Sequence, residues 1–381
     1  MSIREFQLER YFARWEFNAP YLLSASDCET MAIGELIDLA GTSLSALASL
    51  RLGYTESQGD PQLREGIVRF YPTLTPDQIL VTNAPEEAIF LVMQTLLNPG
   101  DQVVVQTPCY QSLAELAAYR GCTVRPWPLR ETESGWQMDL AQLDELITSD
   151  TRLVILNAPH NPTGYLPSVH EFETILNLVA AQGTWLFCDE MYRGLEYDPA
   201  ARLPSASERY ERAISLWGMS KSFGLAGLRI GWLALQDSSL LEALIRWKDY
   251  TTICSSAPSE FLARLALSQA EAIIQRNLAI IQTNLKHIRE FMATQTEVFA
   301  WREPLAGPIA FARLRHGSAA AFCEALVNEK GVLLVPASVF DFGDQHLRFG
   351  LGRRNFPDGL ARLNEYLQTH SLPPSSSSIK A

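Results

Sequence analysis

Short apolar runs alternate with helical patterns over most of the chain. Seven runs are apolar, partly β-branched and bounded by turn-forming residues, which is typical of buried strands. They are residues 78–84, 101–108, 122–129, 152–159, 184–190, 213–220 and 228–235. Between them, residues 86–97, 110–121 and 169–183 have helical spacing. The alternation predicts an α/β large domain at 46–265, a mostly parallel seven-stranded sheet sandwiched by helices.

The pattern changes after this domain and predicts a smaller α+β domain at 266–370. It contains one long amphipathic stretch, one shorter helical stretch and three strand-like runs. These are residues 270–295, 318–331, 307–314, 331–338 and 346–352. We expect the first segment, 1–45, to pack with the small domain or to cover a cleft. The serine-rich tail, 371–381, is expected to be disordered.

Composition narrows the possible functions. A chain of 381 residues that is 47% hydrophobic can form large cores, and its net charge of −12 without Lys/Arg clusters argues against nucleic-acid binding. Six cysteines form no CxxC pair and have no adjacent histidine ligands, so no metal site is expected. The start of the chain has no apolar leader, and no apolar run is long enough to span a membrane. A cytoplasmic protein with reduced thiols is therefore expected.

Lysine is scarce, which shortens the search for a nucleophilic amine. The chain has five lysines among 31 basic residues. Lys380 lies in the tail, Lys330 is expected at a helix end, and Lys248 and Lys286 are expected on solvated faces of amphipathic helices. Only Lys221 has no such explanation.

Lys221 follows a predicted strand in "SKSFGLAGLRIG", among small residues that allow close backbone approach. The preceding residues lack the glycine spacing of a phosphate-binding P-loop. A desolvated lysine is partly neutral near pH 7 and can form a Schiff base with an aldehyde. The alternative is a surface lysine at a strand end.

This segment resembles the lysine segment of class I and II aminotransferases, pyridoxal-phosphate enzymes of the aspartate aminotransferase fold (fold type I), and further motifs follow in family order. The resemblance implies that Lys221 holds pyridoxal 5′-phosphate as an internal aldimine and later moves the substrate proton. It also implies that Arg229 binds the cofactor phosphate. The implied activity is transfer of an amino group from an α-amino acid to a 2-oxo acid.

The cofactor requires a carboxylate beside its ring nitrogen, because the ring withdraws electrons only while that nitrogen is protonated. "WLFCDEMY" supplies Asp189 at a strand end, and Tyr192 is expected to donate to the phenolic oxygen of the cofactor. "LNAPHNPTGYL" resembles the family loop in which an asparagine, here Asn161, bonds to the same oxygen. Without the other motifs, Asp189 is also typical of a helix N-cap or a loop residue, and the asparagine loop is typical of an ordinary turn.

Three further residues complete the resemblance. Tyr110 is expected to cover the cofactor ring, although core packing explains it equally well without the other motifs. Tyr54 in "YTESQGDPQLREGI" is expected to reach the phosphate of a partner subunit, which implies a homodimer with shared active sites. Arg348 in "HLRFGLG" is expected to bind the substrate carboxylate, rather than to be a surface arginine on a strand whose neighbouring residues are buried.

The departures from the family gather at the phosphate. Gly218 stands where serine is common, and Ala84, Pro85 and Glu86 replace the usual small and hydroxyl residues at a helix start. Proline has no amide hydrogen, and an ionised glutamate repels a phosphate unless it turns away. Helix amides and a hydroxyl of Ser220 or Ser222 are expected to help compensate.

Two groups of alternatives remain open. The same residues support other reactions on this fold, namely carbon-sulfur lyases, cyclopropane-forming synthases, and oxidative or cyclising amino-acid enzymes. Outside enzymes, the fold serves as the cofactor-binding sensor domain of a transcription regulator. That function would need an additional winged-helix domain.

Overall fold

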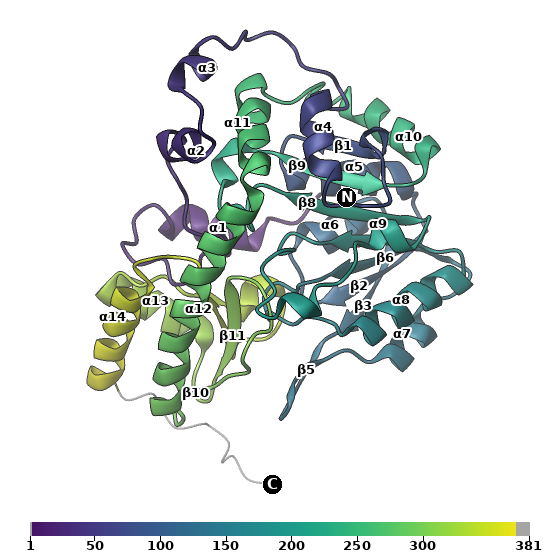
Figure 1. The fold of residues 1–381 in the computed structure, drawn as a ribbon. Helices are drawn as coiled ribbons and strands as arrows, with labels where there is room; N and C mark the ends of the chain where they lie inside the picture. Colours follow the sequence, from purple (N-terminus) through teal and green to yellow (C-terminus); the bar gives the residue numbers. More distant parts are fainter. Residues whose placement is uncertain (1, 371–381) are drawn as a thin grey trace.

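A computed structural model describes residues 2–370 of the chain (Figure 1). The predicted tail at 371–381 lies outside these residues. A seven-stranded sheet lies at 79–235 and a four-stranded sheet at 299–350, each packed against helices. The domain boundaries stay predictions.

The large sheet contains all seven strands expected from the apolar runs. They are β1 (Ile79–Thr82), β2 (Gln102–Thr107), β3 (Thr123–Pro128), β6 (Thr151–Asn157), β7 (Trp185–Asp189), β8 (Ala213–Gly218) and β9 (Gly231–Leu235). Their order is β1-β9-β8-β7-β6-β2-β3, and β9 runs opposite to the other six strands. The mostly parallel sheet is therefore confirmed.

Alternate residues of the central strands enter two separate cores. Val103 and Val105 of β2 pack with α5 (Pro85–Leu96), whereas Val104 packs with α8 (Val169–Ala181). Helices α6 (Ser112–Tyr119), α10 (Ser238–Lys248) and α4 (Pro61–Val68) belong to the first side, and α7 (Leu140–Leu146) to the second. Because both faces are covered, the strands are apolar along their whole length.

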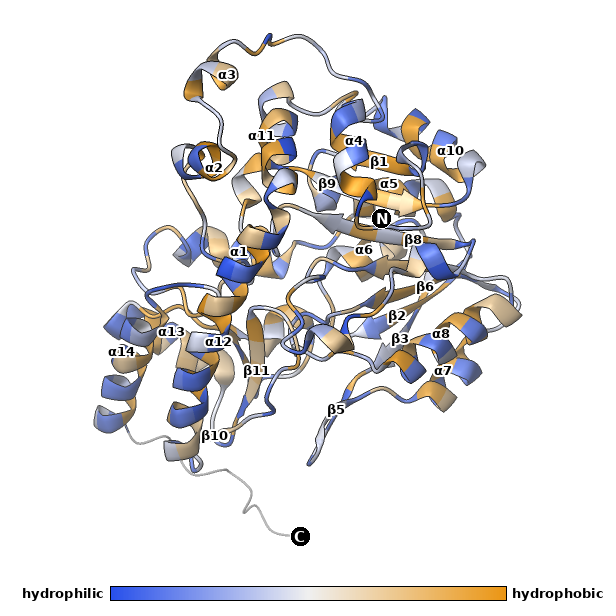
Figure 2. Cartoon of the chain, viewed as in Figure 1, coloured by the Kyte–Doolittle hydropathy of each residue, from blue (hydrophilic) through white to orange (hydrophobic). Residues whose placement is uncertain are grey.

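The smaller sheet has the order β10-β11-β13-β12, formed by Phe299–Ala300, Ile309–Leu314, His346–Gly350 and Val335–Pro336. It packs against α12 (Ala270–Thr294), α13 (Ala319–Lys330) and α14 (Phe356–Thr369). Figure 2 shows mixed apolar and polar colouring on α12 and α14, as expected for helices with one face in a core. The run predicted as a strand at 331–338 is paired only at Val335–Pro336, because Val332 instead bridges to Tyr21.

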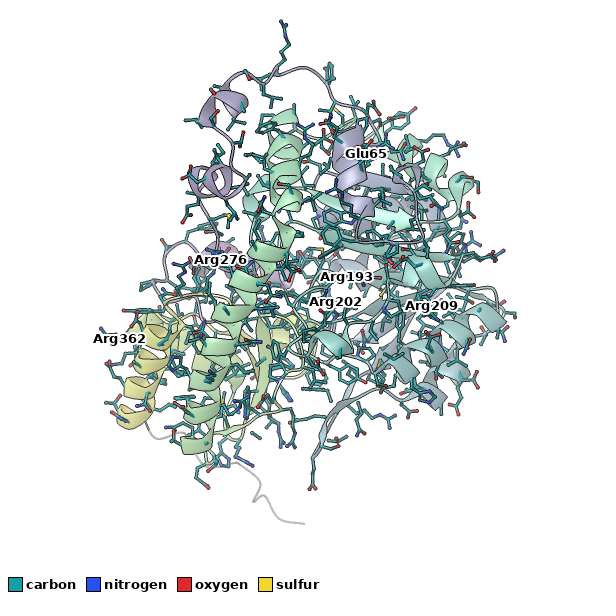
Figure 3. The ribbon with its side chains drawn as sticks, in the orientation of Figure 1. Glu65, Arg193, Arg202, Arg209, Arg276 and Arg362 are labelled. Atoms are coloured by element: carbon teal, nitrogen blue, oxygen red, sulfur yellow. The ribbon has the colours of Figure 1, made fainter. Side chains whose placement is uncertain are left out.

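The first segment contains two helices that the sequence pattern did not indicate, α1 (Gln7–Trp15) and α2 (Ile33–Leu39), and a third, α3 (Leu44–Ala48), crosses its predicted end. Tyr11 of α1 donates to the carbonyl of Leu334 at 2.8 Å. Arg276 of α12 donates to the carbonyls of Glu29 (2.8 Å) and Thr30 (3.0 Å), and Figure 3 labels it on that helix. These contacts fasten the segment to the C-terminal part of the chain.

The position of Lys248 differs from the expectation. It was expected on a solvated helix face, but it is fully buried at the end of α10, and burial lowers its pKa. The chain after α10 folds back over the helix end, where Ile253 donates its N–H to the Lys248 carbonyl at 3.1 Å. The Lys248 amine in turn donates to the Ile253 carbonyl at 3.2 Å.

Candidate active site

A cavity of about 420 Å³ lies where neighbouring strands of the large sheet end. Asn157 is the last residue of β6 and is paired with Asp189, the last residue of β7. The segment with Lys221 follows β8. Parallel strands deliver their carboxyl ends to one edge, which is where open α/β sheets bind ligands.

Seven of the nine predicted site residues line this cavity. They are Tyr110, Asn161, Asp189, Tyr192, Ser220, Lys221 and Arg229. The remaining two, Tyr54 and Arg348, do not, for opposite reasons. Tyr54 is 91% exposed, whereas Arg348 is 0% exposed.

The amine of Lys221 faces the first segment of the chain. It donates to the hydroxyl of Ser26 at 2.8 Å. Burial lowers its pKa, and the charge of Arg348 lowers it further, while Asp27 opposes this effect. A lowered pKa increases the fraction of neutral amine, which is the nucleophilic form.

Asp189 is a buried carboxylate without an ion pair among residues 2–370. Its Oδ1 accepts the N–H of Met191 at 3.1 Å. Burial raises its pKa to about 7. A cationic N–H group placed against this carboxylate would relieve the cost of burying its charge, which is what a protonated ring nitrogen offers.

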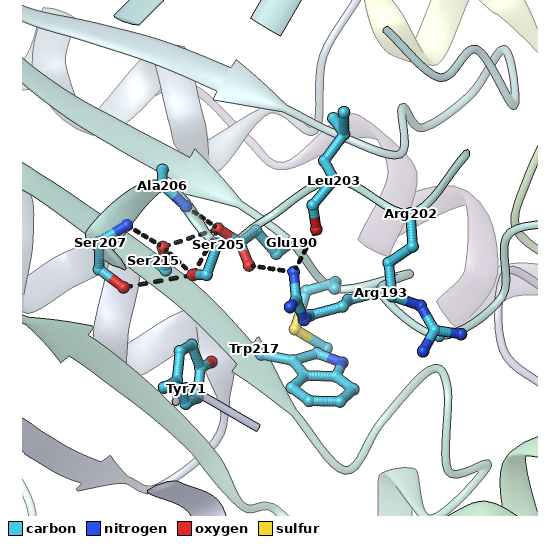
Figure 4. Close-up of polar contacts among 12 residues, drawn as sticks. Tyr71, Glu190, Arg193, Arg202, Leu203, Ser205, Ala206, Ser207, Ser215 and Trp217 are labelled. Carbon is cyan, nitrogen blue, oxygen red and sulfur yellow. Dashed lines mark hydrogen bonds and ion pairs between the residues drawn. The ribbon is translucent and has the colours of Figure 1, made fainter. Parts of the chain in front are cut away.

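The residue after Asp189 anchors the strand end. Glu190 Oε1 accepts from the N–H of Ala206 (2.9 Å) and from the hydroxyls of Ser205 (3.0 Å) and Ser215 (2.7 Å), as Figure 4 shows. Arg193 Nη1 lies 3.5 Å from Glu190 Oε2. Sequence reasoning missed this network, and the acid pair at 189–190 was its only signal. The network fixes the backbone from which the cavity carboxylate projects.

Polar groups connect the cavity to Arg348. The amide of Asn157 donates to the carbonyl of Asp189 at 2.9 Å, and its Oδ1 accepts the N–H of Asn161 at 2.6 Å. Arg348 Nη1 donates to Asn161 Oδ1 at 3.2 Å, and Nη2 donates to the Ser24 carbonyl at 3.0 Å. The guanidinium therefore lies directly behind the asparagine that faces the cavity.

Aromatic rings cover the other side of Arg348. Its guanidinium carbon lies 5.8 Å from the ring centre of Phe12 and 5.4 Å from that of Phe340. Both strand neighbours, Leu347 and Phe349, are also fully buried. A surface position for Arg348 is thus wrong, because the first segment packs over its strand.

Two hydroxyls in the cavity are free to bind a ligand. Tyr192 Oη and Ser220 Oγ are buried, and no residue in the described chain hydrogen-bonds to either. The hydroxyl of Ser222, the other candidate for the phosphate, is instead 2.6 Å from the Arg193 carbonyl and is not part of the cavity lining. Of the two serines, Ser220 alone has its hydroxyl available.

The start of α5 and Arg229 line the end of the cavity where the family resemblance places the cofactor phosphate. Arg229 adopts a left-handed conformation (φ 52°), its side chain is exposed, and Nη1 contacts the Ala226 carbonyl at 3.1 Å. Pro85 and Glu86 both line the cavity. Glu86 therefore does not turn away from the cavity. The Ser112 hydroxyl donates to its Oε2 at 3.3 Å.

The first segment supplies cavity residues that sequence reasoning did not identify. Helix α1 contributes Glu9 and Phe12, its C-cap residue Glu16 follows at helical spacing, and Ser26 and Asp27 come from the irregular stretch after it. The only sequence signal was the helical spacing of residues 8, 9, 12 and 16. The segment lies at the cavity through contacts with residues far along the chain.

Comparison with known proteins agrees with this geometry. The family model for aminotransferase class I and II matches residues 21–355. The chain is 33% identical over 368 residues to capreomycidine synthase of Streptomyces vinaceus, covering 96% of this chain and 94% of that protein. A crystal structure of a PLP-dependent aminotransferase from Streptococcus suis has a TM-score of 0.92 at 28% identity, covering 98% and 100% of the two chains. The PLP-dependent cyclase OrfR has a TM-score of 0.90 at 30% identity, covering 97% and 99%.

The fold and the family match together define a pyridoxal-phosphate enzyme of fold type I. The chain belongs to the class I and II aminotransferase family. Its cofactor is pyridoxal 5′-phosphate, and the cavity offers it an amine, a buried carboxylate and two unpartnered hydroxyls. None of the helices within residues 2–370 is both long and apolar enough to cross a membrane.

Proposed function

We propose that the chain converts an α-amino acid whose side chain carries a positive charge, using pyridoxal phosphate bound between Lys221 and Asp189. We infer the charge of the substrate side chain from two glutamates at the cavity, one in α1 and one at its C-cap. Glu9 and Glu16 both line it and form no ion pair with the described residues.

The electrostatics of this pair favour a cation. Burial raises the pKa of Glu16, and the charges of Asp27 and Glu9 raise it further, whereas Lys221 lowers it. Asp27 already pairs with Arg353 at 2.8 Å, so it has less capacity for a second cation. A guanidinium or ammonium group on the substrate would relieve the repulsion between the glutamates.

The chain's own residues supply the proton transfers. When bound, the cofactor withdraws electrons from the substrate Cα. The pKa of Lys221 is lowered, so its neutral amine can take the proton from the substrate Cα. The same amine then gives that proton back to another atom of the reacting molecule. Asp189 would hold the ring nitrogen proton of the bound cofactor, Tyr192 and Asn161 would bind its phenolic oxygen, and Tyr110 would pack on its ring. Ser26, which accepts from the lysine amine at 2.8 Å, holds that amine in the cavity.

Arg348 binds the substrate carboxylate only after a local movement. Its guanidinium is buried behind Asn161 and under Phe12. A carboxylate that displaces the Ser24 carbonyl or the Asn161 amide as hydrogen-bond partner would offer a charged, two-point contact instead. Phe12 of α1 covers one side of the guanidinium, so access from that side requires movement of α1.

Transfer of the amino group to a 2-oxo acid is the first candidate reaction. It is supported by the family match and by the Streptococcus suis structure. A second candidate is a cyclisation in which a side-chain nitrogen bonds to Cβ while a leaving group on Cβ, such as a hydroxyl lost as water, departs. It needs no acceptor and is supported by the similarity to capreomycidine synthase and to the cyclase OrfR. Both candidates use one lysine base and one buried carboxylate.

The active form is a homodimer in which Tyr54 reaches the phosphate bound by the partner. In support, Tyr54 is almost fully exposed, and exposed apolar residues lie near it in sequence or on the facing loop. They include Leu44, Leu52, Tyr250 and Ile253. Dilution below the dimer dissociation constant should then reduce cofactor affinity.

The test is a panel of paired amino acids that differ in side-chain charge, such as arginine with citrulline and lysine with norleucine. Each is incubated with the loaded protein, with and without 2-oxoglutarate, and products are identified by mass spectrometry. We expect the cationic member of a pair to react faster, and Glu16→Gln to reduce this preference about tenfold. A cationic amino acid with a hydroxyl on Cβ, such as β-hydroxyarginine, is added to the panel. Transamination requires the oxo acid, whereas cyclisation proceeds without it and releases water from this substrate.

Equal rates for both members of each pair would overturn the substrate class. Binding of the cofactor without conversion of any amino acid would instead favour the regulatory alternative.

A further inference from the structure

Glu86 occupies the second position of α5 and faces the phosphate end of the cavity. Pro85 before it has no N–H, and the backbone N–H groups of Glu86 and Glu87 have no acceptor within the helix. The unpartnered, 93% buried hydroxyl of Ser220 lines the same cavity, as does Arg229. These donors mark where an anion binds, and Glu86 lines the same cavity, with its Oε2 accepting from the Ser112 hydroxyl at 3.3 Å.

The groups that face Glu86 have opposing effects on a negative charge there. Hydrogen bonds from the hydroxyls of Ser112 and Tyr110 stabilise the charge, whereas Glu9 of α1 and Asp189 of β7 repel it. Glu86 forms no ion pair with residues 2–370.

Two arginines line a second cavity behind Glu86 but leave it unpaired. They are Arg4 and Arg10. Arg4 is paired with Glu115 at 3.2 Å and with Asp341 at 2.7 Å. Because no cation pairs with Glu86, the cost of burying its charge is not offset. Burial raises the pKa of Glu86 to about 7, and the charge of Glu9 adds to this effect.

The neighbouring glutamate has a different environment. Glu87 Oε2 accepts the N–H of Asn83 at 2.6 Å, and its Oε1 accepts the hydroxyls of Thr251 (2.5 Å) and Thr252 (2.7 Å). Glu87 is not part of the cavity lining. The two adjacent acids thus provide an internal comparison, one beside the anion site and one directed away from it.

We propose that Glu86 binds the cofactor phosphate as a neutral carboxylic acid that donates a hydrogen bond to a phosphate oxygen, so that cofactor affinity falls as pH rises above neutrality. The inference rests on the proposed placement of the phosphate at Arg229 and Ser220. A neutral acid replaces the hydroxyl donor that this helix start lacks. Loss of its proton would set a carboxylate against the phosphate.

The test measures binding rather than turnover. The probe is pyridoxamine 5′-phosphate, which has no aldehyde and cannot bond covalently to Lys221. Its dissociation constant is determined by equilibrium dialysis between about pH 6 and pH 9 for the full-length protein, Glu86→Gln and Glu87→Gln. Pyridoxamine, which lacks the phosphate, is measured in parallel.

We expect the native affinity to weaken by up to about tenfold per pH unit above neutrality, relative to Glu86→Gln, because one proton is linked to binding. The glutamine keeps a neutral donor, so its affinity near pH 6 should equal the native value. Glu87→Gln should keep the native pH dependence, and pyridoxamine should show no difference between the proteins. Unfolding curves by circular dichroism confirm that each variant is folded.

Parallel pH profiles for the native protein and Glu86→Gln would overturn the inference while leaving the cofactor site intact. Failure of all proteins to bind pyridoxamine 5′-phosphate at any pH would instead contradict the proposed placement of the phosphate and, with it, the inference. The two failures are therefore distinguishable.

Discussion

The ring of Pro85 lies against the position where a side chain on Gly218 would begin. A Cβ atom at Gly218 would lie 3.2 Å from Pro85 Cγ, and also 2.9 Å from the Ile230 carbonyl oxygen. A Cβ at Gly231, the partner of Gly218 across the strands, would lie 2.7 Å from the Pro85 nitrogen. The unusual proline at the helix start and the unusual glycine before Lys221 are therefore one packing arrangement, because each leaves room for the other.

This arrangement predicts that Gly218→Ser destabilises the protein. The added side chain meets the Ile230 carbonyl and the proline ring, and such overpacking costs about 1–3 kcal/mol. Urea unfolding measures the loss. Gly227→Ser is the control, because a Cβ at Gly227 meets nothing within 4 Å. Pro85→Ala should restore only part of the loss, and equal stability of both serine variants would contradict the packing argument.

Lys221→Ala is expected to lower turnover by about 10²- to 10⁴-fold, because no other amine lies in the cavity to move the proton. The visible absorption band of the covalently bound cofactor should disappear, while pyridoxamine 5′-phosphate should still bind. Lys286→Ala, an exposed lysine of α12, is the control and should change neither readout. A coloured, fully active Lys221→Ala protein would show that another residue carries the cofactor.

Arg348→Lys is expected to raise the KM for the amino acid by about 10- to 100-fold, with a smaller effect on kcat. Lysine keeps the charge but loses the planar two-point contact, and a hydrogen bond to a charged group contributes about 1.5–3 kcal/mol. Steady-state kinetics separate the two constants. Arg313→Lys, a partly exposed arginine on the neighbouring strand β11, is the control. An unchanged KM would remove Arg348 from carboxylate binding.

Glu190→Gln is expected to lower the free energy of unfolding by about 1–3 kcal/mol. The amide leaves Arg193 without its buried counter-charge and presents N–H groups to the serine hydroxyls and the Ala206 N–H. Because the charge of Glu190 raises the pKa of Asp189, the substitution should also lower that pKa. Thermal unfolding measures the first effect, with exposed Glu211→Gln as the matched control. Similar melting temperatures for both variants would show that the network contributes little stability.

The protein without cofactor is expected to lose stability between about pH 5 and pH 8. Burial raises the pKa of Asp189, Glu86 and Glu260 to about 7 each, so the folded state holds protons that the unfolded state releases near pH 4. The stabilisation is complete below the unfolded pKa and is lost as pH rises through the folded value. Glu260→Gln, outside the cavity, should flatten the pH profile of the melting temperature. A steeper profile would contradict this sign.

Local patterns in the sequence determined the large sheet. A strand buried on both faces is apolar along its length, and this signal depends on no distant residue, so all seven strands were found. The signal failed where burial came from elsewhere. Lys248 has a polar side chain at the end of an amphipathic helix, and only the returning chain at Ile253 buries it.

The candidate site likewise contains residues that local motifs predicted and residues that no local pattern indicated. Motifs at strand ends predicted the residues around Lys221 and Asp189, because the carboxyl ends of parallel strands share one edge of a sheet. No local pattern connects Glu16 with Lys221, or Phe12 with Arg348, since these pairs are separated by more than 200 residues.

The sequence by itself therefore determined the fold class and the strand positions, and by family resemblance it singled out the lysine that we propose binds the cofactor. The tertiary structure alone decided that α1 brings two glutamates to the cavity, that Arg348 is buried beneath an aromatic ring, and that Pro85 fits against Gly218. Periodicity encodes which face of an element is buried. It does not encode which distant element covers that face, and packing between elements decides the charge and shape of the cavity.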